Sequence, residues 1–189
     1  CSLVGSEMCI RDSRYFVGNG IPKLVERLAP ADQRTPAVLE AALADFKRDY
    51  GQHLRDTTAP YPGIPEMLAK LKANGVQLAV FSNKADALAK EVVKDYFGTQ
   101  YFTIVRGQMT GVAPKPAAEG TNALLQALHA DPASTLYVGD SNVDVETAHN
   151  ANLPCCGAVW GFRTREELNA AGAEYLAENS DELYDVIMK

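Results

Sequence analysis

The sequence has no long apolar run, few cysteines and few histidines, and each shortage excludes a class of protein. Its longest apolar stretches, such as 78–81, are the length of one strand and too short to span a membrane. The four cysteines, Cys1, Cys9, Cys155 and Cys156, form no Cys-x-x-Cys pair, and three histidines do not complete a zinc-site spacing. We therefore expect a reduced, cytoplasmic globular protein.

Positive charge is also in short supply. The 189 residues include 18 Lys and Arg against 24 Asp and Glu, a formal net charge of −6. This balance argues against nucleic acid and against an anionic membrane surface as partners. A small anionic substrate remains compatible, because a pocket can be positive on an acidic protein. The 47% of hydrophobic residues is enough for a sizeable core.

Residues 1–13 (CSLVGSEMCIRDS) show neither helical nor strand periodicity. They lack the basic and apolar regions of a signal peptide, and they resemble the translated sequencing-adapter tails found in some environmental gene collections. We expect this segment to be a non-native tail that carries no function.

The remaining chain divides into a helical part, 14–58, and an alternating part, 59–189, joined by a linker rich in proline. In the second part, apolar runs typical of buried strands alternate with amphipathic segments. Strands are expected at 76–81, 101–105, 136–138, 155–160 and 173–177, and helices at 64–73, 86–96, 117–129, 141–150, 164–171 and 180–188. This alternation predicts an α/β fold, a doubly wound, Rossmann-like parallel sheet with helices on both faces. Cys155 and Cys156 should then face opposite ways, one inward and one outward.

Three expected strand ends carry polar residues. Ser82 and Asn83 follow the first strand, Lys115 precedes a helix after the second, and Asp140 with Asp144 follows the third. Ligands bind beyond the carboxyl ends of strands in such sheets, so these residues should gather at one edge. Each has an ordinary explanation by itself, such as a helix cap or a surface lysine. Their order along the chain indicates a site.

The residue types fit a phosphate held with magnesium. Asp140 and Asp144 supply the hard oxygen ligands that Mg²⁺ prefers. Ser82 can donate its hydroxyl to a phosphate oxygen, and the amides after it are expected to open the next helix, which suits an anion. Lys115 can neutralise phosphate charge, and Gly139 allows the backbone a close approach.

These motifs resemble the haloacid dehalogenase superfamily, in a branch that is similar to phosphoglycolate phosphatases. The residues that carry the resemblance are FSNK at 81–84, KP at 115–116 and YVGDSNVD at 137–144, preceded by YPGIPEMLAKLKANG at 61–75. The resemblance implies a core domain at 59–189, a partial helical cap at 14–58, a Mg²⁺ cofactor and a small phosphorylated metabolite as substrate.

The resemblance also implies roles for individual residues. Ser82 matches the phosphate-binding serine and Lys115 the lysine of the catalytic set, while Asp140 matches the magnesium-binding acid and Asp144 the acid that supports it at the metal site. Substrate binding is implied for Asn83 and for the loop Gly18, Asn19 and Gly20, which lies in a segment similar to the family's substrate-facing cap.

One element of the family is missing from the sequence. The nucleophile of the family lies in a DxDx[TV] motif at the end of a first strand, and no Asp-x-Asp occurs anywhere in this chain. We expect the first strand to be absent through truncation. The chain would then keep the residues that stabilise charge and lack the nucleophile and the general acid/base, so that it is inactive alone although its full-length parent is a phosphatase.

Three alternatives stand beside phosphoglycolate hydrolysis. A sugar-phosphate phosphatase or a phosphoglucomutase-like transferase is the nearest, although mutase loops often place Ser-Arg after the glycine where this chain has Asn19 and Gly20. A non-enzymatic, receiver-like phosphate-binding module would need its acids earlier in the chain. A dinucleotide-binding fold would need a GxGxxG motif, which is missing. The sequence carries no signal for an oligomeric state.

Overall fold

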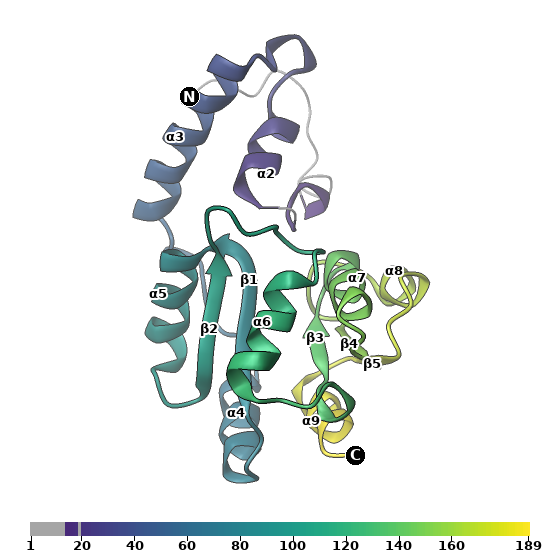
Figure 1. Ribbon diagram of the computed structural model, residues 1–189. Helices are drawn as coiled ribbons and strands as arrows, with labels where there is room; N and C mark the ends of the chain where they lie inside the picture. Colours follow the sequence, from purple (N-terminus) through teal and green to yellow (C-terminus); the bar gives the residue numbers. More distant parts are fainter. Residues whose placement is uncertain (1–13, 19) are drawn as a thin grey trace. The chain divides into compact units, whose positions relative to one another are not determined.

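The computed structural model describes residues 14–18 and 20–189, in two compact units that divide between Thr58 and Ala59 (Figure 1). The expected non-native tail, 1–13, and Asn19 lie outside the described residues. In the part of the chain that the structure describes, no helix is long and apolar enough to cross a membrane. Identification of the units as a cap fragment and a core stays a prediction.

The first unit is helical. Val25 on its second element is buried, and the two longer helices pack against each other. Thr35 begins the longest helix by accepting a hydrogen bond from the Val38 amide through its side chain, at 3.4 Å. The elements are η1 (Arg14–Phe16), α2 (Ile21–Leu28), η2 (Ala31–Gln33) and α3 (Pro36–Gln52).

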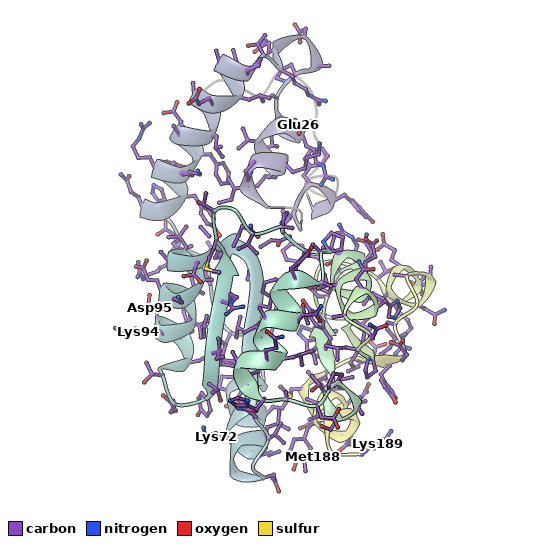
Figure 2. The ribbon with its side chains drawn as sticks, viewed as in Figure 1. Glu26, Lys72, Lys94, Asp95, Met188 and Lys189 are labelled. Carbon is purple, nitrogen blue, oxygen red and sulfur yellow. The ribbon has the colours of Figure 1, made fainter. Side chains whose placement is uncertain are left out.

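The second unit alternates strands and helices along the chain, as expected for an α/β fold. The strands are β1 (Leu78–Ala85), β2 (Phe102–Gln108), β3 (Tyr137–Gly139), β4 (Cys155–Ala158) and β5 (Tyr175–Ala177). The helices are α4 (Ile64–Ala73), α5 (Asp86–Phe97), α6 (Glu119–Leu128), η3 (Pro132–Ser134), α7 (Asn142–Asn150), α8 (Arg165–Ala170) and α9 (Ser180–Ile187). The outer faces of α4 and α5 carry exposed charges, among them Lys72, Lys94 and Asp95 (Figure 2).

All strand pairs are parallel, which confirms the fold class, but the strands form two sheets where one continuous sheet was expected. β1 pairs with β2, and β3, β4 and β5 form the second sheet in that order. In the described residues no strand lies paired between β1 and β3. Ala79 on β1 and Val138 on β3 are exposed, although strands of parallel sheets are ordinarily covered on both faces. The first strand that the family resemblance implies has no counterpart here among the described residues.

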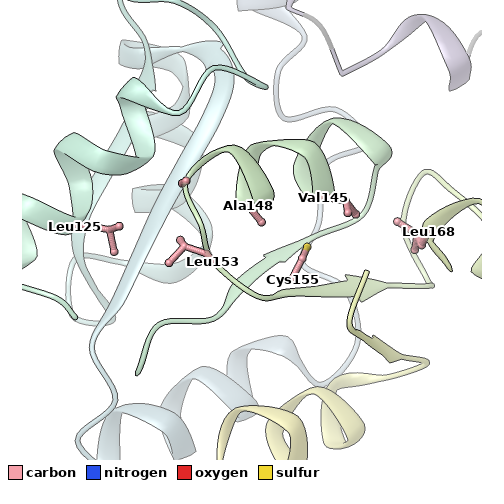
Figure 3. Packing of buried hydrophobic residues seen from close by; sticks show 7 residues of the cluster. Leu125, Val145, Ala148, Leu153, Cys155 and Leu168 are labelled. Carbon is pink, nitrogen blue, oxygen red and sulfur yellow. The ribbon is translucent and has the colours of Figure 1, made fainter. Parts of the chain in front are cut away.

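Helices cover both faces of the second sheet, so the prediction that one of the two adjacent cysteines faces outward is wrong. Cys155 and Cys156 are both fully buried. Cys155 packs in a cluster with α7 and α8, shown in Figure 3, whereas Cys156 packs in a second cluster with α4 and α9. Alternation along a strand places the two thiols on opposite faces, and each face is a core.

The second cluster includes residues of both sheets. Leu125 of α6 joins the first cluster, and α6 also contacts β1 and β2. Leu78 of β1 and Phe102 of β2 pack against the second cluster beside Leu136 and Cys156. β1 and β3 are therefore held in one unit although the strands do not pair.

Candidate functional site

The centre of the site is an ion pair between the loop before α6 and the first turn of α7. The Lys115 Nζ lies 2.7 Å from Oδ1 of Asp144, and the two side chains are 12% and 9% exposed. Lys115 follows the long loop after β2, while Asp144 is the third residue of α7, one turn beyond the end of β3. The structure therefore brings together the ammonium and one of the two late acids that the sequence predicts at a common edge.

Asp144 is saturated by donors from its own neighbourhood. Its Oδ2 accepts from the hydroxyl of Ser141 at 2.6 Å and from the Asp140 amide at 3.3 Å. Gly139 packs directly against Asp144, because a β-carbon at position 139 would overlap the Asp144 side chain. The expected need for glycine at this close approach is thus met in the structure.

Asp140 lies at the end of β3 and is held from the turn after β4. Its Oδ2 accepts from the Phe162 amide at 3.2 Å, and its backbone carbonyl accepts from the Arg163 amide at 3.1 Å. A β-carbon at Gly161 would overlap the Asp140 side chain. Burial and the neighbouring Asp144 charge raise the pKa of Asp140, so this carboxylate is poised to gain from a nearby cation.

The ammonium of Lys115 is enclosed by three different groups. Asp144 lies against it, the ring of Phe81 lies 5.9 Å from it, and the hydroxyl of Tyr137 interacts with it. Burial alone would lower the pKa of Lys115, but Asp144 and Tyr137 outweigh burial and the net shift is upward. Burial raises the pKa of Tyr137 to about 12. At neutral pH the site therefore holds a charged lysine and a neutral tyrosine.

Ser82 lies within β1, and the structure differs here from the prediction that amides after it open a helix. β1 continues to Ala85 and α5 begins at Asp86, because Ala85 still pairs with Gln108 of β2. The Ser82 hydroxyl accepts from the Lys84 amide at 3.1 Å. Its proton has no acceptor among the described residues and remains suited to an anion.

Asn83, next to Ser82, is buried and its amide bonds the backbone of Lys115 twice. Oδ1 accepts from the Lys115 amide at 2.8 Å, and Nδ2 donates to the Lys115 carbonyl at 3.2 Å. These bonds connect the end of β1 to the ion pair. Substrate contact by Asn83, predicted from the sequence, stays a prediction.

The remaining predicted site residues belong to the first unit. Gly18 and Gly20 adopt φ angles of 121° and 85°, a region that side chains rarely occupy, so both positions require glycine. Gly20 also begins α2. Their predicted contact with substrate stays a prediction, and Asn19 lies outside the described residues.

The donors present are of the type that Mg²⁺ takes, but they do not form a complete site. In the described residues no group of three or more His, Cys, Asp or Glu side chains is arranged to hold a metal ion. Asp144 uses both oxygens on protein donors, whereas Asp140 receives one amide bond from Phe162. The metal-binding roles predicted for Asp140 and Asp144 stay predictions.

Sequence reasoning missed several residues of this site. Ser141 is buried and donates to Asp144, and it stands openly in the Gly-Asp-Ser motif. Gly161 and the Phe162 amide had no comparable signal, because their contact with Asp140 crosses from β4 to β3. Phe81 was assigned to a strand, and only the fold places its ring beside Lys115.

Comparisons with a family model and with individual relatives identify the same family of proteins. Residues 6–158 match the model of the haloacid dehalogenase-like hydrolases. A phosphoglycolate phosphatase of Mesorhizobium japonicum is 31% identical over 87% of this chain and 74% of its own length. A phosphoglycolate phosphatase of Neisseria meningitidis is 33% identical over 78% of this chain, which spans 64% of that relative.

A solved structure gives the same result at the level of the fold. The crystal structure of a predicted phosphoglycolate phosphatase from Lactobacillus delbrueckii subsp. bulgaricus superposes with a TM-score of 0.88. It is 26% identical, and the match covers 96% of this chain and 84% of that one.

Proposed function

This chain belongs to the haloacid dehalogenase-like hydrolase family, and from that premise we propose that it carries the phosphate- and metal-binding half of a Mg²⁺-dependent phosphatase. The substrate proposed is a small phosphomonoester, with 2-phosphoglycolate as the first candidate, because the relatives named above are phosphoglycolate phosphatases. The observation that carries the proposal is the buried pair of Lys115 and Asp144 beside Asp140, at the ends of β1 and β3.

Each group has a distinct task in such a reaction. Lys115 places a compact positive charge against the phosphate oxygens, and Ser82 donates its hydroxyl to one of them. Asp140 would hold the Mg²⁺, with Asp144 orienting Lys115 and the Asp140 amide. Bound Mg²⁺ supplies further positive charge that offsets the negative charge of the transferring phosphoryl group. Preorganised charges of this kind stabilise the transition state of phosphoryl transfer more than they stabilise the bound substrate.

The nucleophile must come from a carboxylate outside the motifs present, because the sequence contains no Asp-x-Asp. We propose that a strand carrying this motif pairs between β1 and β3. The open edges of these strands and the exposed Ala79 and Val138 leave room for it. The first aspartate would attack phosphorus and release the alcohol, which takes a proton from the second aspartate, and the second aspartate would then activate water to hydrolyse the aspartyl-phosphate.

The test compares the 189-residue chain with a chain extended at its amino end by an apolar strand and Asp-x-Asp-Gly-Thr. Both proteins receive Mg²⁺ and a panel of phosphomonoesters that includes 2-phosphoglycolate and sugar phosphates, and released phosphate is measured. Turnover is expected only from the extended chain, and replacing its first new aspartate by asparagine should abolish turnover. This asparagine variant of the extended chain contains the same added strand, so it separates the effect of the nucleophile from the effect of the strand on folding.

Two outcomes contradict the proposal. Robust Mg²⁺-dependent turnover by the 189-residue chain alone would show that its nucleophile lies elsewhere. A folded extended chain that binds inorganic phosphate but hydrolyses no ester of the panel would favour a phosphate-binding module. A preference for a sugar phosphate over 2-phosphoglycolate would keep the phosphatase and change its substrate.

A further inference from the structure

The loop that carries Lys115 has no regular structure to hold it. Between the end of β2 at Gln108 and the start of α6 at Glu119 the chain contains turns but neither strand nor helix. The Lys115 amide and carbonyl therefore have no partner strand. A lysine that must meet a phosphate oxygen within a fraction of an ångström needs a fixed backbone, because its side chain has four rotatable bonds.

Asn83 supplies the missing backbone partner. Its amide accepts from the Lys115 N–H at 2.8 Å and donates to the Lys115 carbonyl at 3.2 Å. One side chain thus makes the pair of hydrogen bonds that a neighbouring strand would make with this residue. Because Asn83 is only 9% exposed, water does not compete freely for these bonds.

The position of Asn83 connects the two strand ends of the site. It follows Ser82 on β1, while Lys115 in turn bonds Asp144 of α7 at 2.7 Å. The centre of the Phe81 ring, also from β1, lies 5.9 Å from the ammonium nitrogen of Lys115. The end of β1 therefore fixes both the backbone and the side-chain environment of the lysine.

We propose that Asn83 is a positioning residue that holds the Lys115 backbone so that the ammonium is aimed at the phosphate. This inference rests on the function proposed above. It differs from direct substrate contact by Asn83, because the amide oxygen and an amide N–H are already engaged with Lys115.

A double-mutant cycle tests the inference with inorganic phosphate in the presence of Mg²⁺, measured by calorimetry. Asn83→Ala is expected to weaken phosphate binding about tenfold in the natural background and by less than about twofold in a Lys115→Ala background. If Asn83 acts only through Lys115, its replacement has little further effect on phosphate binding once the lysine is absent. Equal losses in both backgrounds would mean direct contact with phosphate, or a general structural role, and would overturn the inference.

A second readout reports on Lys115 without any phosphate. At one fixed pH, an amine-acetylating reagent should modify Lys115 several-fold faster in Asn83→Ala than in the unaltered chain, as measured by mass spectrometry of peptides. Lys90, on the outer side of α5, should react at the same rate in both proteins. An unchanged Lys115 rate overturns the inference. If the unaltered chain binds no phosphate, the proposed function fails, whereas the acetylation rate still decides the role of Asn83.

Two further variants serve as controls. Asn74→Ala removes a side-chain bond to the Lys70 carbonyl, 2.8 Å long, at the end of α4, and should leave both readouts unchanged. If circular dichroism shows that Asn83→Ala is unfolded, Asn83→Ser replaces it. Serine is neutral, and its single hydroxyl cannot make both bonds to the Lys115 backbone, so the same two readouts then confirm or overturn the inference.

Discussion

At the scale of single residues, the buried ion pair makes the charge of Asp144 important for the stability of the second unit. Asp144→Asn removes the charge that lies 2.7 Å from Lys115 and leaves a buried ammonium without its counter-ion. We expect a loss of about 3 kcal/mol in the free energy of unfolding, because breaking a buried pair by removing one partner is strongly destabilising. Urea unfolding followed by circular dichroism measures it.

The matched control is Asp181→Asn, which removes an exposed carboxylate 4.0 Å from Lys70. Surface pairs contribute little, so the unfolding midpoint should stay where it is. Equal midpoints for Asp144→Asn and the unaltered protein would contradict the structural assignment of the pair.

Gly161 gives a second prediction at this scale. An added β-carbon would overlap the β-carbon of Asp140, which lies too close to the backbone to move aside. Gly161→Ala should therefore destabilise the second unit by about 2 kcal/mol, the usual size of an overpacking penalty, and should weaken Mg²⁺ binding measured by calorimetry.

Gly51→Ala is the contrasting substitution, because no atom lies within 4 Å of an added β-carbon there and the position is helical. It should stabilise the first unit by about 0.5 kcal/mol, as alanine restricts the unfolded chain more than glycine does. If both glycine variants behaved alike, close packing of Gly161 on Asp140 would be wrong.

The site residues themselves could be predicted because their chemistry stands beside recognisable strands. Lys115, Asp140 and Asp144 follow apolar runs in a fixed order, so topology places them at one edge. The residues that form hydrogen bonds with them could not be predicted from the sequence in this way. Asn83 bonds the backbone of a residue 32 positions away, and a pattern of side chains carries no information on which backbone groups lack a partner.

At the scale of elements, Asp86 joins the start of α5 to β2. Its Oδ1 accepts from the Gly107 amide at 2.9 Å and its Oδ2 lies 2.7 Å from Lys90. The bond to Lys90, with help from the Gly107 amide, lowers the pKa of Asp86 below its ordinary value of 3.8. Since protonation then favours the unfolded chain, the contribution of this carboxylate is complete above that value and is lost as the pH falls through the folded one.

We therefore expect Asp86→Asn to cost about 1 kcal/mol at pH 7, the net contribution of an ordinary protein hydrogen bond. The difference from the unaltered protein should shrink as the pH falls below 3.8. Urea unfolding of both proteins over a pH series measures it. A difference that is constant over the whole series would mean that the charge of Asp86 does not contribute.

Element boundaries were predictable where capping or apolar runs mark them, and less so at β1. The apolar run ends at Phe81, but the strand continues through an irregularity to Ala85, which pairs with β2 again. Apolar periodicity reports burial, whereas a strand end is set by its hydrogen-bonding partner, here Gln108. The helix α8 begins in a capping box of Thr164 and Glu167, a signal that is visible in the sequence.

At the scale of the whole molecule, alternation of strands and helices predicts parallel sheets but not their continuity. The order of strands depends on which edges meet in space, and the same pattern is compatible with one sheet or two. The finding that both cysteines are buried has the same origin. Coverage of the second face of β4 depends on α4 and α9, which come from distant parts of the sequence.

The open edges of β1 and β3 lead to a prediction about hydrogen exchange. β4 pairs on both sides and is buried at every position, whereas β1 and β3 each pair on one side in the described structure. Amides of β4 should therefore exchange more slowly than those of β1 and β3 that face the open edges, by a factor on the order of a hundred. Hydrogen exchange followed by NMR resolves the individual amides.

The extended chain proposed above turns this comparison into a test of the whole architecture. A strand that pairs between β1 and β3 gives hydrogen-bonding partners to amides on both open edges and covers Ala79 and Val138. Exchange at those amides should slow, while exchange in β4, which is already paired on both sides, should change little. If β1 and β3 gain no protection in an extended chain that is folded, the added strand pairs elsewhere. The complete fold would then contain two separate sheets, and an aspartate at the end of the added strand would not lie near Lys115.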